Sequence, residues 1–166
     1  NFGIAKFQAG DLDGSIEAHS LGLQVAEQLD DPMAMIISLM NRAEVQVKAG
    51  RHDEATTGLD RAEQLAQQVG FPYAMVIIPH HRGQIAAEQG RVGAAAKLHF
   101  ASFENALAAD RPLEAVECVE NLAGLAVELG ATGLASRCLG VARVARRHSG
   151  SVASEGVAHR FDEIGA

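Results

Sequence analysis

Residues 32–71, PMAMIISLMNRAEVQVKAGRHDEATTGLDRAEQLAQQVGF, contain one complete structural unit of this chain. Pro32 stands where a helix can begin, because the first turn of a helix does not need the amide hydrogen that proline lacks. A helical pattern follows over about 33–49, and Gly50 can supply the left-handed residue that ends a helix. A second helical pattern covers about 53–69. The stretch therefore predicts two helices joined by a short turn.

The same unit returns at an interval of 40 residues, which indicates a repeat architecture. Gly, Ala or Ser stands at equivalent positions of the repeats, as expected where two helix backbones approach closely. Two further sets of equivalent positions are mostly apolar, and they predict a continuous core. Further helices are expected at about 13–29, 73–89, 93–109, 113–129 and 133–148. The recurring sets are Gly10/Gly50/Gly90/Gly130, Pro32/Pro72/Pro112, Gly3/Ala43/Gly83/Ala123, Ser15/Ala55/Ala95/Ala135, Gly22/Ala62/Ser102/Ala142, Ala5/Val45/Ile85/Leu125 and Phe7/Val47/Ala87/Val127.

This unit resembles the tetratricopeptide repeat (TPR). Gly50, Ala55, Leu59 and Ala62 match its turn glycine, small residue, bulky residue and small residue, although its usual length is about 34 residues. The resemblance implies a single all-α domain over 1–166, a right-handed α-solenoid of about four antiparallel helix hairpins with a C-terminal capping helix. The repeats would span about 1–31, 32–71, 72–111 and 112–150, and the capping helix 151–166, with Ala153, Val157, Phe161 and Ile164 on its apolar face.

A narrower resemblance lies in residues 120–150, ENLAGLAVELGATGLASRCLGVARVARRHSG. This stretch is similar to the C-terminal repeats of large bacterial LuxR-type transcriptional regulators, which also carry a nucleotide-binding module and a DNA-binding helix-turn-helix. The chain starts with Asn1, and residues 1–10 look like the second half of a helix. We therefore expect a fragment of a longer protein.

Composition limits the possible functions. The chain has 166 residues, is 48% hydrophobic and carries a net charge of −7, which is unfavourable for direct binding to nucleic acid. It has no apolar run of membrane-spanning length and no signal-peptide pattern. Cys118 and Cys138 form neither a disulfide framework nor a zinc ligand set. These features favour a cytoplasmic protein with reduced cysteines.

The stretch VIIPHHRG, residues 76–83, is the strongest candidate for a site. Pro79 should kink or locally break its helix. His80 belongs to a face that would line the concave groove of a TPR-like solenoid, and His81 should point towards neighbouring helices. A metal site is not expected, because no set of ligands with suitable spacing accompanies the histidines. The predicted groove residues are Met40, Glu44, Lys48, His80, Gln84, Glu88, Glu117, Glu120 and Glu128.

No motif indicates catalysis. The chain lacks a G-x-x-x-x-G-K-[ST] phosphate loop and a G-x-S-x-G nucleophile elbow. Cys118 is flanked at helical spacing by Ala115 and Leu122, which favours a core thiol over a nucleophile. A basic cluster complements the dipole of the last long helix or forms a small docking patch for an anionic partner. It consists of Arg143, Arg146, Arg147 and His148.

We therefore expect a protein–protein interaction module without enzymatic activity or cofactor. Its mildly acidic groove would bind a peptide or protein segment that is basic or of mixed charge. The alternative is a regulatory segment of a bacterial transcriptional activator, which binds an inducer near His80, Gln84 and Glu120 or packs on a nucleotide-binding module. Phe2, Ile4 and Phe7 form an N-terminal apolar edge that we expect to pack on another copy or on upstream sequence.

Overall fold

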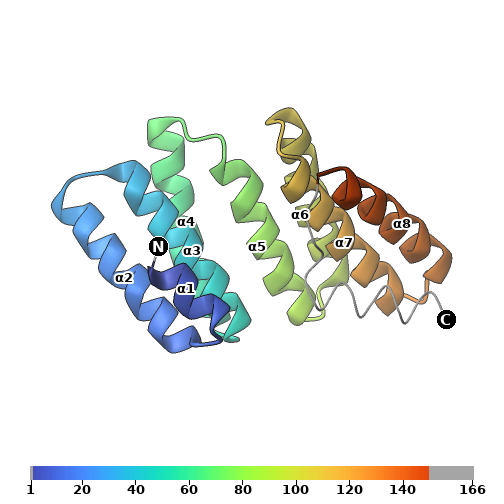
Figure 1. Ribbon diagram of the computed structural model, residues 1–166, viewed down its shortest axis with the longest axis horizontal. Helices are drawn as coiled ribbons and strands as arrows, with labels where there is room; N and C mark the ends of the chain where they lie inside the picture. Colours follow the sequence, from blue (N-terminus) through green and yellow to red (C-terminus); the bar gives the residue numbers. More distant parts are fainter. Residues whose placement is uncertain (1, 150–166) are drawn as a thin grey trace. The chain divides into compact units, whose positions relative to one another are not determined.

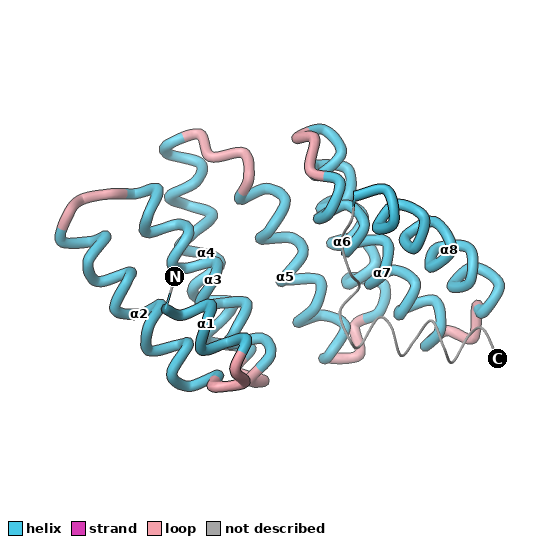
Figure 2. The backbone as a smooth tube through the Cα atoms, in the orientation of Figure 1, coloured by secondary structure: helices cyan, strands magenta, loops and turns pink. Residues whose placement is uncertain are grey.

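The structure is a computed structural model that describes residues 2–149. All regular structure in this part of the chain is helical, with eight helices and no strand (Figure 1). Figure 2 shows that only short connecting segments separate them. The helices are α1 (Phe2–Gln8), α2 (Leu12–Gln28), α3 (Pro32–Lys48), α4 (His52–Val69), α5 (Ala74–Glu88), α6 (Val92–Ala108), α7 (Pro112–Glu128) and α8 (Thr132–Ser149). The predicted capping helix at 151–166 lies outside the described residues.

The helix starts follow from local chemistry. Pro32 and Pro112 are the first residues of α3 and α7, where their missing amide hydrogens cost no hydrogen bond. Asp11 and Asp31 cap α2 and α3, because their carboxylates accept hydrogen bonds from the amides of Gly14 at 2.9 Å and Ala34 at 3.0 Å. The seven helices predicted from α2 to α8 are confirmed, with each end within one residue of its expected place.

The helix ends depend on left-handed backbone. The glycines at the ends of the odd-numbered helices have this conformation, as predicted. The even-numbered helices α2, α4 and α6 end in the same way, which the sequence reading missed. The first set is Gly10 (φ 79°), Gly50 (70°), Gly90 (70°) and Gly130 (71°), and the second is Asp30 (52°), Gly70 (69°) and Asp110 (54°). Each of the first three repeats thus includes two left-handed turns, and the second turn of the fourth repeat would fall outside the described residues.

The chain divides into two compact units, Asn1–Ile85 and Ala86–Ala166. In the first unit α2 packs on α1 and α3, and α3 packs on α4. Its core brings Ala43 and Ala62 into one cluster with Ile36, Leu39 and Leu59, all of them fully buried. Two of the recurring small positions of the second repeat, Ala43 and Ala62, thus lie in the same core cluster.

In the second unit α7 packs on both α6 and α8. Ala86, Ala95 and Leu125 form a buried cluster. Small side chains dominate this unit because they let helix backbones approach closely. The small residues that recur at equivalent repeat positions of α6, α7 and α8 are all fully buried. They are Ala95, Ser102, Ala123, Ala135 and Ala142.

One expectation needs correction. Pro79 lies inside α5, which continues from Ala74 to Glu88 without interruption, so a local break is wrong, whereas the kink stays a prediction. Gly22 is exposed on α2, but the backbone still approaches α3 there, since a Cβ atom on Gly22 would lie 3.5 Å from Ser38 Oγ. Within the described residues, none of the helices has both the length and the hydropathy that a membrane span requires.

Candidate functional site

The nine predicted groove residues differ widely in exposure. Lys48, Glu88, Glu117 and Glu128 are exposed, and Glu44 and Gln84 are half-buried. The other three are buried and present little surface to a partner. Their exposed fractions are 2% for Met40, 9% for His80 and 3% for Glu120.

The two histidines of the PHHRG stretch are linked through one amide side chain. Gln84 Oε1 lies 3.1 Å from His81 Nδ1, and Gln84 Nε2 lies 3.2 Å from His80 Nε2. Because an amide oxygen only accepts and an amide nitrogen only donates, His81 Nδ1 donates and His80 Nε2 accepts. The two rings meet edge to face, with centroids 5.4 Å apart. The pair is therefore a hydrogen-bonded element of the first unit, as expected for buried polar groups.

Two charged groups on α3, Glu44 and Lys48, influence the pKa of His81. Burial lowers the pKa of His81, a Glu44 carboxylate and the bond to Gln84 oppose this effect, and Lys48 reinforces it. Burial also lowers the pKa of His19 on α2, again against the influence of Glu44. Burial thus favours the neutral form of His81 and of His19. We call His80, His81, Gln84, Glu44 and Lys48 the polar cluster.

Metal binding finds no support at the polar cluster. Among residues 2–149, no three or more His, Cys, Asp or Glu side chains converge as metal ligands would. The imidazole of His81 already uses Nδ1 as a donor to Gln84. The absence of a metal site remains a prediction of the sequence.

Glu120 has a different role from the one expected. Its two carboxylate oxygens accept from Arg146 Nε at 2.6 Å and Nη2 at 2.7 Å, which joins α7 to α8. The bond to Glu120 raises the pKa of Arg146 further above its usual value. Arg146 is thus separated from the exposed Arg143 and Arg147. The sequence contained no local signal for this pair, because 26 residues separate its members.

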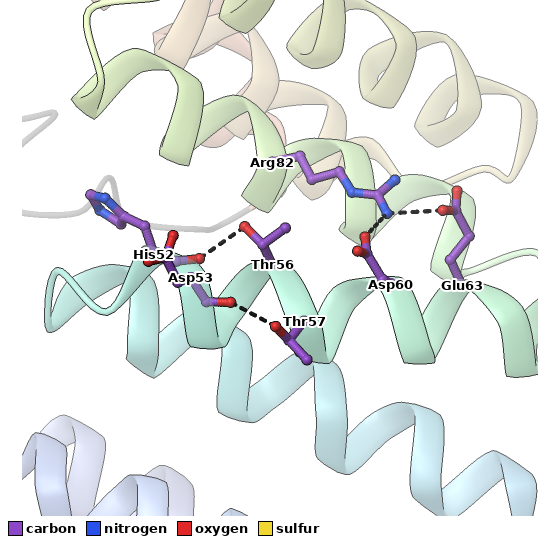
Figure 3. Close-up of polar contacts among 7 residues, drawn as sticks. All are labelled: His52, Asp53, Thr56, Thr57, Asp60, Glu63 and Arg82. Carbon is purple, nitrogen blue, oxygen red and sulfur yellow. Dashed lines mark hydrogen bonds and ion pairs between the residues drawn. The ribbon is translucent and has the colours of Figure 1, made fainter.

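Arg82 joins α5 to α4 (Figure 3). Its Nη2 atom lies 2.7 Å from Asp60 Oδ1 and 2.9 Å from Glu63 Oε2. Burial alone would lower the pKa of Arg82, but its bonds to Glu63 and Asp60 outweigh that effect and raise it. Figure 3 also shows Thr56 and Thr57 bonded to backbone carbonyls one turn earlier in α4, away from Arg82. Arg82 thus ties two helices together.

Cys118 has the properties of a core thiol. It is fully buried, and its Sγ atom donates to Ser102 Oγ at 3.2 Å. Burial raises the pKa of the Cys118 thiol to about 11. Since the thiolate is the nucleophile, this residue is unreactive near neutral pH.

The sequence reading missed a hollow of about 450 Å³ beside α2 and α3. Charged, amide and apolar side chains line this hollow together, so no single sequence pattern predicted it. The lining residues are Glu17, Ser20, Leu21, Leu23, Gln24, Glu27 and Arg42. No family model matches the chain, and no curated protein matches it either. The resemblance to TPR proteins therefore depends on the repeat positions of the sequence.

Proposed function

We propose that the chain is a TPR-like α-solenoid that binds a basic or mixed-charge segment of another protein along its odd-numbered helices. The 40-residue period supports a stack of antiparallel hairpins, because one repeat cannot cover its own apolar face. Exposed charge at equivalent places at the end of α5 and on α7 then supplies a recognition surface within the second unit.

One observation carries this proposal. Glu88 and Glu128 stand exactly one period apart, on α5 and α7, and both are exposed. Glu117 is exposed on the same helix as Glu128, and Lys48 is exposed at the equivalent place on α3. The three carboxylates all belong to the second unit and make its surface acidic, which favours Lys and Arg in the partner through electrostatic complementarity.

The buried residues of the predicted groove support this surface without contacting the partner. His80 and His81 are held by Gln84, and Glu120 is occupied by Arg146. A test by charge reversal should therefore avoid Glu120, since its substitution would disturb the packing of α7 on α8. Glu88 and Glu128 allow the test without that disturbance.

The test uses an array of synthetic peptides that covers a wide range of net charge. We expect the chain to retain peptides rich in Lys and Arg, and the double variant Glu88→Lys with Glu128→Lys to lose at least about tenfold in affinity for them. Glu104→Lys on α6, which is exposed and outside the odd-numbered helices, is the matched control and should bind as the unaltered chain does. Equal losses in both variants, or no retained peptide, would contradict the proposal.

A further inference from the structure

An apolar stripe lies exposed along α2. Leu21, Val25 and Leu29 follow one another at intervals of four residues, and their exposed fractions are 61%, 46% and 73%. Such spacing places Leu21 and Val25 on one face of α2, and Leu29, the C-cap residue with a helical backbone conformation, continues that face. Most exposed apolar residues occur singly, so a row of this kind marks a surface suited to contact with another helix.

The surroundings of this stripe are acidic. Residues 7–41 contain six carboxylates and neither Lys nor Arg. Asp13 and Glu27 are paired with Arg51, the residue before α4, and with Arg61 of α4. Among residues 2–149 Glu17 has no ion-pair partner, and it lines the hollow together with Leu21 and with Arg42 of α3. The stripe and the hollow therefore meet at Leu21, beside a carboxylate that is available to a cation.

Helix α8 has the opposite character. Residues 129–149 contain four arginines and no carboxylate. Leu134, Val141 and Val144 are exposed by 48%, 64% and 52%, and helical spacing places them on one side of α8. Gly140 lies beside them with open space around it, so a second helix can approach the backbone closely.

The arginines of α8 complete its complementarity to α2. Arg146 is bound to Glu120, which leaves three others. Arg137, Arg143 and Arg147 are exposed, and none of them has an ion-pair partner among the described residues. The surface of α8 thus combines exposed apolar side chains with unpaired cations. The surface of α2 combines exposed apolar side chains with an available carboxylate and a net acidic border, so the two surfaces are complementary.

We propose that α8 of one copy of this chain docks on α2 of a second copy. The two surfaces differ from each other, so the contact is head-to-tail and can extend into a ring or a chain of subunits. Burial of the apolar side chains drives the association, and the charges set its direction and oppose α2–α2 and α8–α8 contacts. This contact differs from the N-terminal edge of Phe2 and Ile4 and from the acidic surface of α5 and α7.

The experiment measures molar mass by light scattering over a wide range of protein concentration. The full chain should at least double in mass across the range, and raising NaCl from about 50 mM to about 0.5 M should weaken the association because exposed charges are screened. Leu21→Arg with Val25→Arg removes the α2 surface, and Val141→Glu with Val144→Glu removes the α8 surface. Each double variant alone should remain monomeric.

Mixing the two double variants gives the decisive result. The first retains an intact α8 surface and the second an intact α2 surface, so together they should form a one-to-one dimer that cannot extend. Phe2→Glu with Ile4→Glu is the control and should assemble as the unaltered chain does. Unaltered circular dichroism shows that each variant is folded. A chain that stays monomeric, a mixture that stays monomeric, or assembly abolished only by the Phe2 and Ile4 changes would overturn the proposal.

Discussion

The imidazole of His19 lies directly over the α-carbon of Gly3, so that a Cβ atom on Gly3 would come within 2.6 Å of His19 Nε2. The contact joins α1 to α2, and Ser15 Oγ strengthens it by donating to the Gly3 carbonyl at 2.8 Å. The second repeat has Ala43 and Leu59 at the equivalent positions, both fully buried. A larger ring on one helix is thus matched by a smaller residue on the other.

Gly3→Ala should therefore destabilise the packing of α1 on α2 by about 1–3 kcal/mol, because the added methyl group forces the imidazole away. The double variant Gly3→Ala with His19→Leu reproduces the pair of the second repeat and should recover most of that loss. Chemical denaturation, with hydrogen exchange to locate the change in α1 and α2, measures both effects. A double variant less stable than Gly3→Ala would show that the two positions do not compensate each other.

The buried pair of Glu120 and Arg146 should be more important to folding than any surface ion pair. Arg146→Ala leaves the Glu120 carboxylate buried without its partner, and a broken buried pair of this kind typically costs about 3–5 kcal/mol. By contrast, Glu120→Leu with Arg146→Met removes both charges and should cost much less. Urea denaturation of the three chains measures the difference.

The matched control for this comparison is Arg51→Ala, which breaks an exposed pair with Asp13. Exposed ion pairs contribute about 0–1 kcal/mol, so this change should have little effect. If Arg146→Ala were equally mild, the contact between α7 and α8 would depend on apolar packing alone.

Acid should weaken the first unit through His81. Its pKa in the folded chain lies below the ordinary value of 6.5, because burial disfavours the imidazolium. As pH falls below 6.5, the unfolded chain takes up a proton that the folded chain does not, so stability falls by up to about 1.4 kcal/mol per pH unit. Above pH 7 this contribution is complete and constant.

His81→Gln should reduce the difference in unfolding free energy between pH 7 and pH 5, because the group that titrates is gone. His148→Gln changes an exposed histidine of α8 and serves as the control. Comparing the differences between variants removes the common contribution of the carboxylates. An identical pH dependence in the unaltered chain and in His81→Gln would mean that the ring is protonated equally in both states.

The sequence predicted the elements of this fold well and the roles of single side chains less well. Gly50, Pro32 and Ala62 act through backbone geometry or size, so their period alone predicted turns, helix starts and buried contacts. His80 was different, since helical spacing placed it on a face but could not show which neighbour covers that face.

The other features that the sequence did not predict depend on contacts between residues far apart in the chain. Glu120 looked like an ordinary groove carboxylate because its partner Arg146 lies on the next helix, where the charge also fitted the expected helix-end cluster. The hollow at Leu21 and Arg42 combines side chains from two helices, so it appears only when their packing is known. Periodicity predicts which residues are equivalent, whereas such pairs depend on differences between the repeats.

The second set of left-handed turns gives a final prediction. Gly70 (φ 69°) has open space around it, so Gly70→Ala tests the backbone alone and should destabilise the chain by about 1 kcal/mol. Gly70→Asp should cost less than Gly70→Val, because Asp30 and Asp110 already adopt this conformation and a β-branched residue resists it. Gly93→Ala is the control, since Gly93 is helical and also has open space, and it should stabilise the chain by about 0.5–1 kcal/mol. Thermal denaturation ranks the four variants, and a Gly70→Ala chain as stable as Gly93→Ala would show that the turn does not require its left-handed residue.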